Sequence, residues 1–325
     1  MEQEIQQQTS NKQGRGPKQH VFLRMKHEEL MKNRSYAKTI KAAWKAFNNN
    51  FATIFRHIWA YALALAGIIA LYVITAMRIS SEPVSISAII TFAFLFILLI
   101  GVSAVFAGRA DMLINPKSFL WNIGRVLKLY LLELVVLFII GAIAATILLF
   151  CLPEQAQLST QPQDIVSQQH AAMNVLTAVS VLTFSGIVIS LLLLPFVYVS
   201  MKYIADTETS LLKILWSGYK TGMRYWGYIF LTFLIAVIAV FIPSLLISLP
   251  NTILNIAVGI NEHGVTNGDP SGLPSYINLL SFSTALVTYF LLAFITVFNL
   301  FMAYYLYGTI ETRQQERNTL TDISL

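Results

Sequence analysis

Six long apolar runs constrain the fold of this chain more than any other feature. An α-helix needs about 20 mostly apolar residues to cross the hydrocarbon core of a bilayer. The runs are continuous rather than alternating, which excludes a transmembrane β-barrel. The sequence therefore predicts an all-α, polytopic membrane protein with six transmembrane helices. The six runs are residues 57–77, 86–107, 129–152, 175–201, 225–249 and 281–308.

The composition supports the same prediction and excludes several kinds of site. Of the 325 residues, 56% are hydrophobic and only 12% are charged, whereas a soluble domain carries about 25% charged residues. The single cysteine, Cys151, excludes an internal disulfide. No two of the five histidines have metal-ligand spacing on one helix face. Because no set of acids, bases or metal ligands converges, the sequence predicts neither an enzyme nor a cofactor nor a metal site.

Basic residues are distributed very unevenly along the chain. With six spans, both termini lie on the same side of the membrane. Of the 22 Lys and Arg residues, all but Arg78 lie in segments on that side. Lysine and arginine are retained in the cytoplasm during insertion, so we expect both termini to be cytoplasmic.

A sequence register repeats three times, each time just before an apolar run. Each copy begins at a serine, with a lysine ten residues later and a phenylalanine twenty residues later. The three sets are Ser35, Lys45 and Phe55; Ser118, Lys128 and Phe138; and Ser210, Lys220 and Phe230. We therefore predict one membrane domain, residues 35–308, made of three units that each comprise an amphipathic helix and a transmembrane hairpin. The predicted units are residues 35–107, 118–201 and 210–308, between a disordered cytoplasmic tail at 1–34 and a second cytoplasmic tail at 309–325.

The repeated helices separate apolar from basic residues. At about 100° per residue, the aromatic and aliphatic side chains of the first copy form one stripe and its lysines lie on the far side. Such helices lie in the headgroup layer of a membrane, with cationic side chains near anionic lipid. Each cation contributes about 1 kcal/mol there, so lipid contacts alone account for the lysines. The predicted membrane-surface residues are Lys38, Lys41, Trp44, Lys45, Lys128, Lys213, Lys220 and Arg224.

Two other partners would also attract lysines, and both fit less well. A nucleic-acid-binding helix would not need an apolar face before every hairpin. A partner protein that binds amphipathic helices would account for one copy but not for three. Membrane lipids are therefore the expected partners and nucleic acid is not, while protein partners and homo-oligomer formation stay open.

Four residues inside the apolar runs are candidates for an intramembrane polar site. Glu133 is an ionisable residue at membrane depth, where a functional role and a structural ion pair are both to be considered. Asn299 is expected to form an interhelical hydrogen bond or to contact a substrate. Pro195 and Pro243 are either ordinary membrane prolines or kinks that expose backbone carbonyls, as in transporters.

Two stretches with their following spans carry a resemblance to known proteins. The sequences SYAKTIKAAWKAFNNNF and SLLKILWSGYKTGMRYW resemble those of a broad group of bacterial six-span integral membrane proteins. The group includes the membrane domain that accompanies some glycerophosphodiester phosphodiesterases. The resemblance implies a multi-pass fold in the bacterial cytoplasmic membrane. It transfers no catalytic residues, because no segment outside the spans is long enough to hold a phosphodiesterase module.

The sequence leaves two hypotheses for function. The first is a non-enzymatic membrane scaffold or lipid-interacting factor, suggested by the few intramembrane charges and the basic surface helices. The second is a small-solute or lipid transporter that uses a polar site between the helices.

Overall fold

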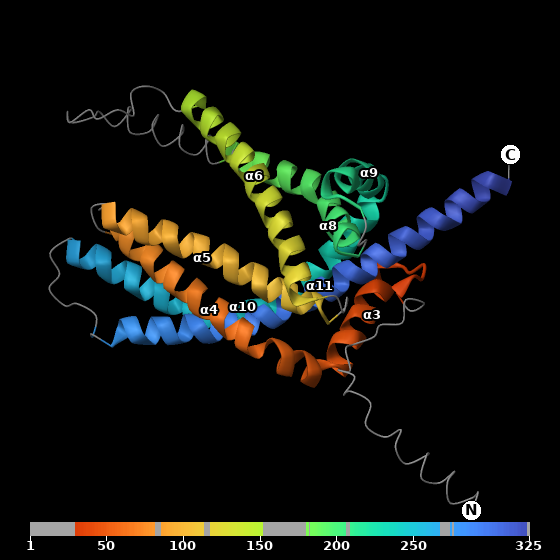
Figure 1. Ribbon diagram of the computed structural model, residues 1–325. Helices are drawn as coiled ribbons and strands as arrows, with labels where there is room; N and C mark the ends of the chain where they lie inside the picture. The colour runs from red at the N-terminus through yellow and green to blue at the C-terminus, as the bar shows by residue number, and fades with distance from the viewer. Residues whose placement is uncertain are drawn as a thin grey trace, which may run out of the picture.

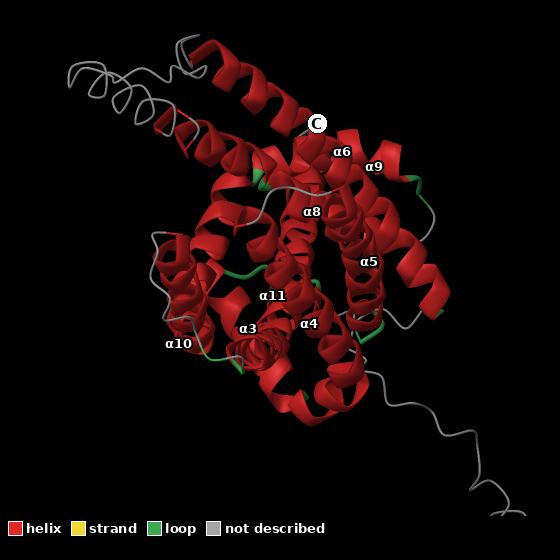
Figure 2. Ribbon diagram, turned by 90° about the vertical axis from the view of Figure 1, so that its left-hand side faces the viewer, coloured by secondary structure: helices red, strands yellow, loops and turns green. Residues whose placement is uncertain are grey.

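A computed structural model describes most of the chain, and its regular secondary structure is entirely helical (Figure 2). The described residues are 30–81, 86–113, 118–151, 180–181, 183–205, 209–266, 274 and 276–323. Within them, six helical segments are long and apolar enough to cross a membrane. The predicted all-α, multi-pass membrane protein is thereby confirmed. The six segments are Phe51–Thr75, Ile86–Asp111, Phe119–Ala144, Thr183–Ala205, Trp226–Val258 and Ile277–Thr321.

The last helix is the centre of the molecule. Helix α11 (Ile277–Ile323) packs against α3 (Tyr36–Asn49), α4 (Phe51–Ser81), α8 (Pro195–Ala205) and α10 (Trp226–Thr266). Ten consecutive residues of α11, 301–310, are all buried. A helix that is buried on every side must be apolar nearly all round, and this stretch reads FMAYYLYGTI.

The remaining helices are arranged around this centre. Helix α5 (Ile86–Asp111) runs back along α4, and α6 (Phe119–Cys151) begins beside α5 and then diverges from it (Figure 1). The short helix α9 (Leu211–Arg224) packs on α8. Helices α3 and α9 both lie near the end of α11 that leads to its C-terminus, and we call this end of the molecule the α3/α9 end.

The first and third copies of the sequence register each form a separate short helix, whereas the second copy is the first part of a long helix. Helices α3 and α9 each have 14 residues, are preceded by Ser35 and Ser210, and end in turns at Asn50 and Tyr225. In the second copy α6 runs without a break from Phe119, so the separate amphipathic helix predicted there is not seen. The position equivalent to the two turns holds Glu133, a good helix former, which explains why that helix continues.

The faces of α3 differ in part from the prediction. Lys38, Lys41 and Lys45 are exposed, as expected for its basic face. Ala43 is fully buried and Phe47 is 8% exposed, because this side of α3 packs on α10 and α11. The apolar stripe that was predicted to rest on lipid therefore contacts protein along much of its width.

The boundaries of both predicted tails differ from the structure: the predicted N-terminal tail ends too late and the predicted C-terminal tail begins too early. Helix α11 continues past residue 308 to Ile323, so residues 309–323 belong to the last helix. At the other end Leu30 is buried, and a Cβ atom at Gly308 would lie 2.5 Å from the Leu30 carbonyl oxygen. Arg313 donates from Nη2 to the Arg34 carbonyl at 2.7 Å. Residues 30–34 are thus held against α11, while residues 1–29 of the predicted tail lie outside the described part.

Pro195 divides the fourth span, and two aromatic side chains compensate for the break. Helical residues 183–193 are followed by a turn at Leu194, after which α8 begins at Pro195. Proline has no N–H, so the carbonyl of Leu191 loses its usual partner four residues later. The Trp226 indole Nε1 donates to that carbonyl at 2.8 Å. The Tyr219 hydroxyl donates to the next carbonyl, that of Leu192, at 3.2 Å.

We expect Trp226→Phe to reduce the free energy of unfolding by about 1 kcal/mol, because a carbonyl inside an apolar span loses its donor. Phenylalanine keeps an aromatic ring next to Phe230, which stacks on Trp226 at a centroid distance of 5.1 Å. The measurement is unfolding of the purified protein by SDS in mixed micelles. Trp216→Phe is the control, since Trp216 is 82% exposed. Equal effects of the two substitutions would contradict the role of the indole N–H.

Candidate functional site

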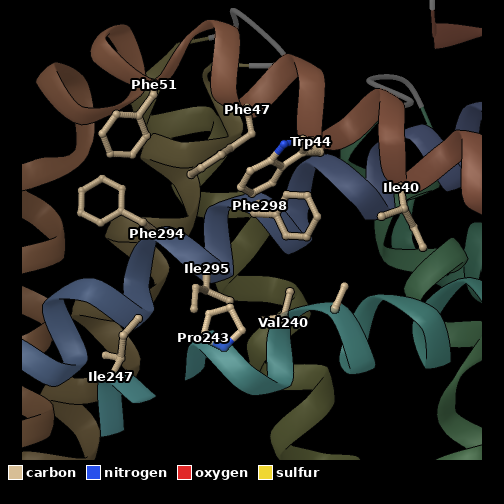
Figure 3. A pocket seen from close by; sticks show the side chains of 11 residues that line it. Ile40, Trp44, Phe47, Phe51, Val240, Pro243, Ile247, Phe294, Ile295 and Phe298 are labelled. Carbon is tan, nitrogen blue, oxygen red and sulfur yellow. The ribbon is translucent and has the colours of Figure 1, made fainter. Parts of the chain in front are cut away.

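An apolar groove runs between α3, α10 and α11 at the α3/α9 end. Its volume is about 470 Å³. Figure 3 shows the three helices lying along its length, with α3 forming one wall and α10 and α11 the others. The lining residues come from four helices, since α4 contributes its first residue. They are Ile40, Trp44, Phe47, Phe51, Ala239, Val240, Pro243, Ile247, Phe294, Ile295 and Phe298.

Aromatic contacts between α3 and α11 fix one wall of the groove. Trp44 meets Phe298 edge to face at a centroid distance of 5.8 Å. Phe47 contacts the same ring at 6.0 Å, also edge to face. Phe51 lies 5.8 Å from Phe294 further along. Such pairs stabilise a fixed ring geometry beyond the area they bury, so the groove is bounded by a rigid wall.

The opposite wall contains one of the predicted site residues, Pro243. Helix α10 stays helical through this proline, so the predicted break of the helix is not seen. Pro243 has no N–H to donate to the Ala239 carbonyl, and both residues line the groove. None of the lining side chains is charged, and the indole N–H of Trp44 is their one polar group. The groove can hold an alkyl chain, but its side chains supply neither an acid nor a base.

The lysines of α3 stand beside this groove. Lys41 and Lys45 directly follow the lining residues Ile40 and Trp44, about 100° further round the helix. Trp44 is 55% exposed, so the edge of the groove is open next to the basic face. Apolar walls and cationic side chains are therefore neighbours on one short helix.

The other predicted surface residues lie elsewhere. Lys213, Lys220 and Arg224 are exposed on α9, on a helix whose Trp216 is also largely exposed. Lys128 is exposed on α6, where it lines a different pocket together with Arg125. The predicted membrane-surface residues thus lie on three different helices, α3, α6 and α9.

The four predicted polar-site residues are not brought together. Pro243 lines the groove, and Pro195 forms the break that Trp226 and Tyr219 close. Asn299 is exposed on α11, one turn after Ile295, and makes no hydrogen bond with the described residues. Glu133 lines a separate pocket beside α8.

Sequence reasoning missed a cluster of polar residues between α8 and α11. Lys202 Nζ lies 2.9 Å from Glu311 Oε1, and the buried Tyr198 donates its hydroxyl to the same oxygen at 2.6 Å. The side chains of Lys202 and Glu311 are 26% and 15% exposed. Glu311 is more than 100 residues from both Tyr198 and Lys202 in the sequence, and it lies in the predicted C-terminal tail. No local spacing pattern could have paired them.

Within the described residues, no group of three or more His, Cys, Asp or Glu side chains is placed to hold a metal ion. Comparison with protein-family models, curated proteins and solved structures finds no match to this chain. The resemblance to the membrane domain that accompanies some glycerophosphodiester phosphodiesterases therefore stays a prediction.

Proposed function

We propose that this protein is a non-enzymatic, lipid-interacting factor of the bacterial cytoplasmic membrane, with both termini in the cytoplasm. Its groove between α3, α10 and α11 holds one acyl chain of an anionic phospholipid. The observation that carries the proposal is the position of a wholly uncharged groove next to the exposed lysines of α3.

Two physical effects support an anionic lipid as the occupant. A lipid acyl chain is already in an apolar medium, so the hydrophobic effect contributes little to its binding in the groove. Binding must instead come from close packing of the chain against rigid walls. The aromatic contacts of Trp44, Phe47 and Phe51 provide such walls. The headgroup adds attraction to Lys38, Lys41 and Lys45, about 1 kcal/mol for each lysine.

The small-solute form of the transporter hypothesis has less support. A path for a small polar solute needs polar groups that converge on one cavity. Pro243 lines an uncharged groove, the Pro195 break is closed by Trp226 and Tyr219, and Glu133 and Asn299 lie in different places. The arrangement favours retention of a lipid over passage of a solute.

Filling the groove tests the proposal. We expect Val240→Phe to weaken binding of phosphatidylglycerol to the detergent-solubilised chain about tenfold, because the added ring occupies the volume of the acyl chain. The measurement is a native mass spectrometry titration with the purified full chain. Val237→Phe is the matched control, since Val237 is on the same helix, is 57% exposed and does not line the groove.

Replacing Lys38, Lys41 and Lys45 together by glutamine tests the headgroup contact. At about 1 kcal/mol per lysine, phosphatidylglycerol should bind about a hundredfold more weakly, while binding of zwitterionic phosphatidylcholine should hardly change. If Val240→Phe and Val237→Phe bind phosphatidylglycerol alike, the groove is not the lipid site. If the lysine variant loses both lipids equally, the basic face does not select the headgroup.

A further inference from the structure

A second pocket opens between α6 and the fourth span, and it contains the carboxylate of Glu133. Its volume is about 410 Å³. The pocket is otherwise apolar except for the hydroxyl of Ser200 on α8. It shares no lining residue with the groove beside α3. The lining residues are Leu132, Glu133, Val136, Leu137, Leu193, Phe196, Val197, Ser200 and Met201.

Nearby cations do not neutralise Glu133 within the protein. Among the residues that the structure describes, Glu133 forms no ion pair and no hydrogen bond. Lys128 is five residues earlier on α6, about 140° away round the helix, and lines another pocket. Lys202 on α8 is paired with Glu311 at 2.9 Å. The carboxylate is therefore open to a cation from outside the protein.

The surroundings of Glu133 decide which kind of cation fits. Small inorganic cations need several oxygen ligands, and the pocket offers one carboxylate and one hydroxyl. A charged residue inside a span is otherwise costly and calls for a partner. A primary ammonium is satisfied by a charge-assisted hydrogen bond to one carboxylate. If the ammonium is part of a molecule with an alkyl chain, that chain can also pack against apolar walls such as Val136, Leu137 and Leu193.

One side of the pocket lies close to the end of a span. Ser200 is five residues before Ala205, where both α8 and the fourth span end, so its Cα lies about 7 Å from that end. Ser200 is thus within reach of a headgroup, and Glu133, fourteen residues after Phe119 at the start of the third span, lies deeper. Ser200 adds a hydroxyl that can donate to a phosphate oxygen.

We propose that this pocket binds an aminophospholipid, with the lipid ammonium paired to Glu133 and one acyl chain along α6 and the fourth span. The site is distinct from the groove and does not depend on the function proposed above. This second lipid site prefers a headgroup that carries an ammonium, whereas the groove prefers an anionic headgroup.

The test is a titration of the purified full chain with phosphatidylethanolamine, followed by native mass spectrometry. Glu133→Gln keeps the size of the side chain and removes its charge. We expect it to weaken binding of phosphatidylethanolamine about tenfold, the value of one charge-assisted contact. Phosphatidylglycerol with the same acyl chains should bind equally to both proteins. The titrations are repeated in the Val240→Phe background, so that a lipid in the groove does not contribute.

Two further variants keep the proposal falsifiable if Glu133→Gln folds poorly. Leu193→Trp fills the pocket without changing its charge and should weaken binding of phosphatidylethanolamine to a similar extent. Ser190→Ala is the control, because Ser190 lies on the same span and outside the pocket, bonded to the Gly186 carbonyl at 2.8 Å. Unchanged phosphatidylethanolamine binding in both pocket variants would overturn the proposal. Equal losses of phosphatidylethanolamine and phosphatidylglycerol in Glu133→Gln would do the same.

Discussion

Replacing Glu311 by alanine is expected to reduce the free energy of unfolding by about 3 kcal/mol. The substitution removes the ion pair with Lys202 and the acceptor of the Tyr198 hydroxyl. A cation that is mostly buried is then left without its carboxylate, and such losses cost about 3–5 kcal/mol when the site is fully enclosed. Because Lys202 keeps 26% of its side-chain surface, the lower end of that range applies. SDS-induced unfolding in mixed micelles measures the effect.

The control for this experiment lies on the same helix. Glu316 accepts a hydrogen bond from Asn33 at 2.9 Å in an exposed position, so Glu316→Ala should cost less than about 1 kcal/mol. In a double-mutant cycle, Lys202→Ala and Glu311→Ala should be clearly non-additive. Additive effects, or equal effects of Glu311→Ala and Glu316→Ala, would show that the pair does not tie α8 to α11.

The second large effect is expected at Gly222, where α9 packs against the start of α8. A Cβ atom at this position would lie 2.8 Å from Pro195 Cβ and 3.0 Å from the Pro195 carbonyl oxygen. The added methyl group would collide with backbone and with the rigid proline ring, and moving either one costs free energy. We expect Gly222→Ala to lower the free energy of unfolding by about 2 kcal/mol, as overpacking does elsewhere.

Gly141→Ala is the matched comparison for that substitution. Gly141 lies within α6, and a Cβ atom there would meet no atom within 4 Å. Alanine is the better helix former by about 1 kcal/mol, so this change should leave stability equal or higher. If the two alanine variants unfold at the same SDS concentration, α9 and α8 are not in close contact around Gly222.

The six spans could be predicted because a bilayer imposes one simple rule on length and polarity. Among the described residues, the predicted runs are helical except at the turns at Leu194 and Tyr225, and the other differences lie at the ends. Helices α10 and α11 extend to Thr266 and Ile323, beyond the predicted ends of the apolar runs at residues 249 and 308. Polar residues with good helix propensity can follow an apolar run, so a prediction from hydropathy alone ends the helix too early.

The groove and the ion pair could not be predicted for a different reason. Trp44, Val240 and Phe298 belong to three helices that are far apart in the sequence, and only tertiary packing brings them together. The amphipathic pattern of α3 predicts an apolar stripe, but such a pattern cannot tell whether lipid or protein covers that stripe. Glu133 can be recognised from the sequence as a charge within an apolar run, but its pocket depends on α8, whose start is set by Pro195.

The contact between Leu30 and Gly308 joins the beginning of the described chain to its final helix. On the ribosome, residues 30–49 emerge early and wait through the synthesis of more than two hundred further residues before α11 exists. During that interval α3 lacks the surface on which it finally rests. Assembly in the membrane therefore requires α11, and a chain that stops before α11 leaves α3 exposed to cellular quality control.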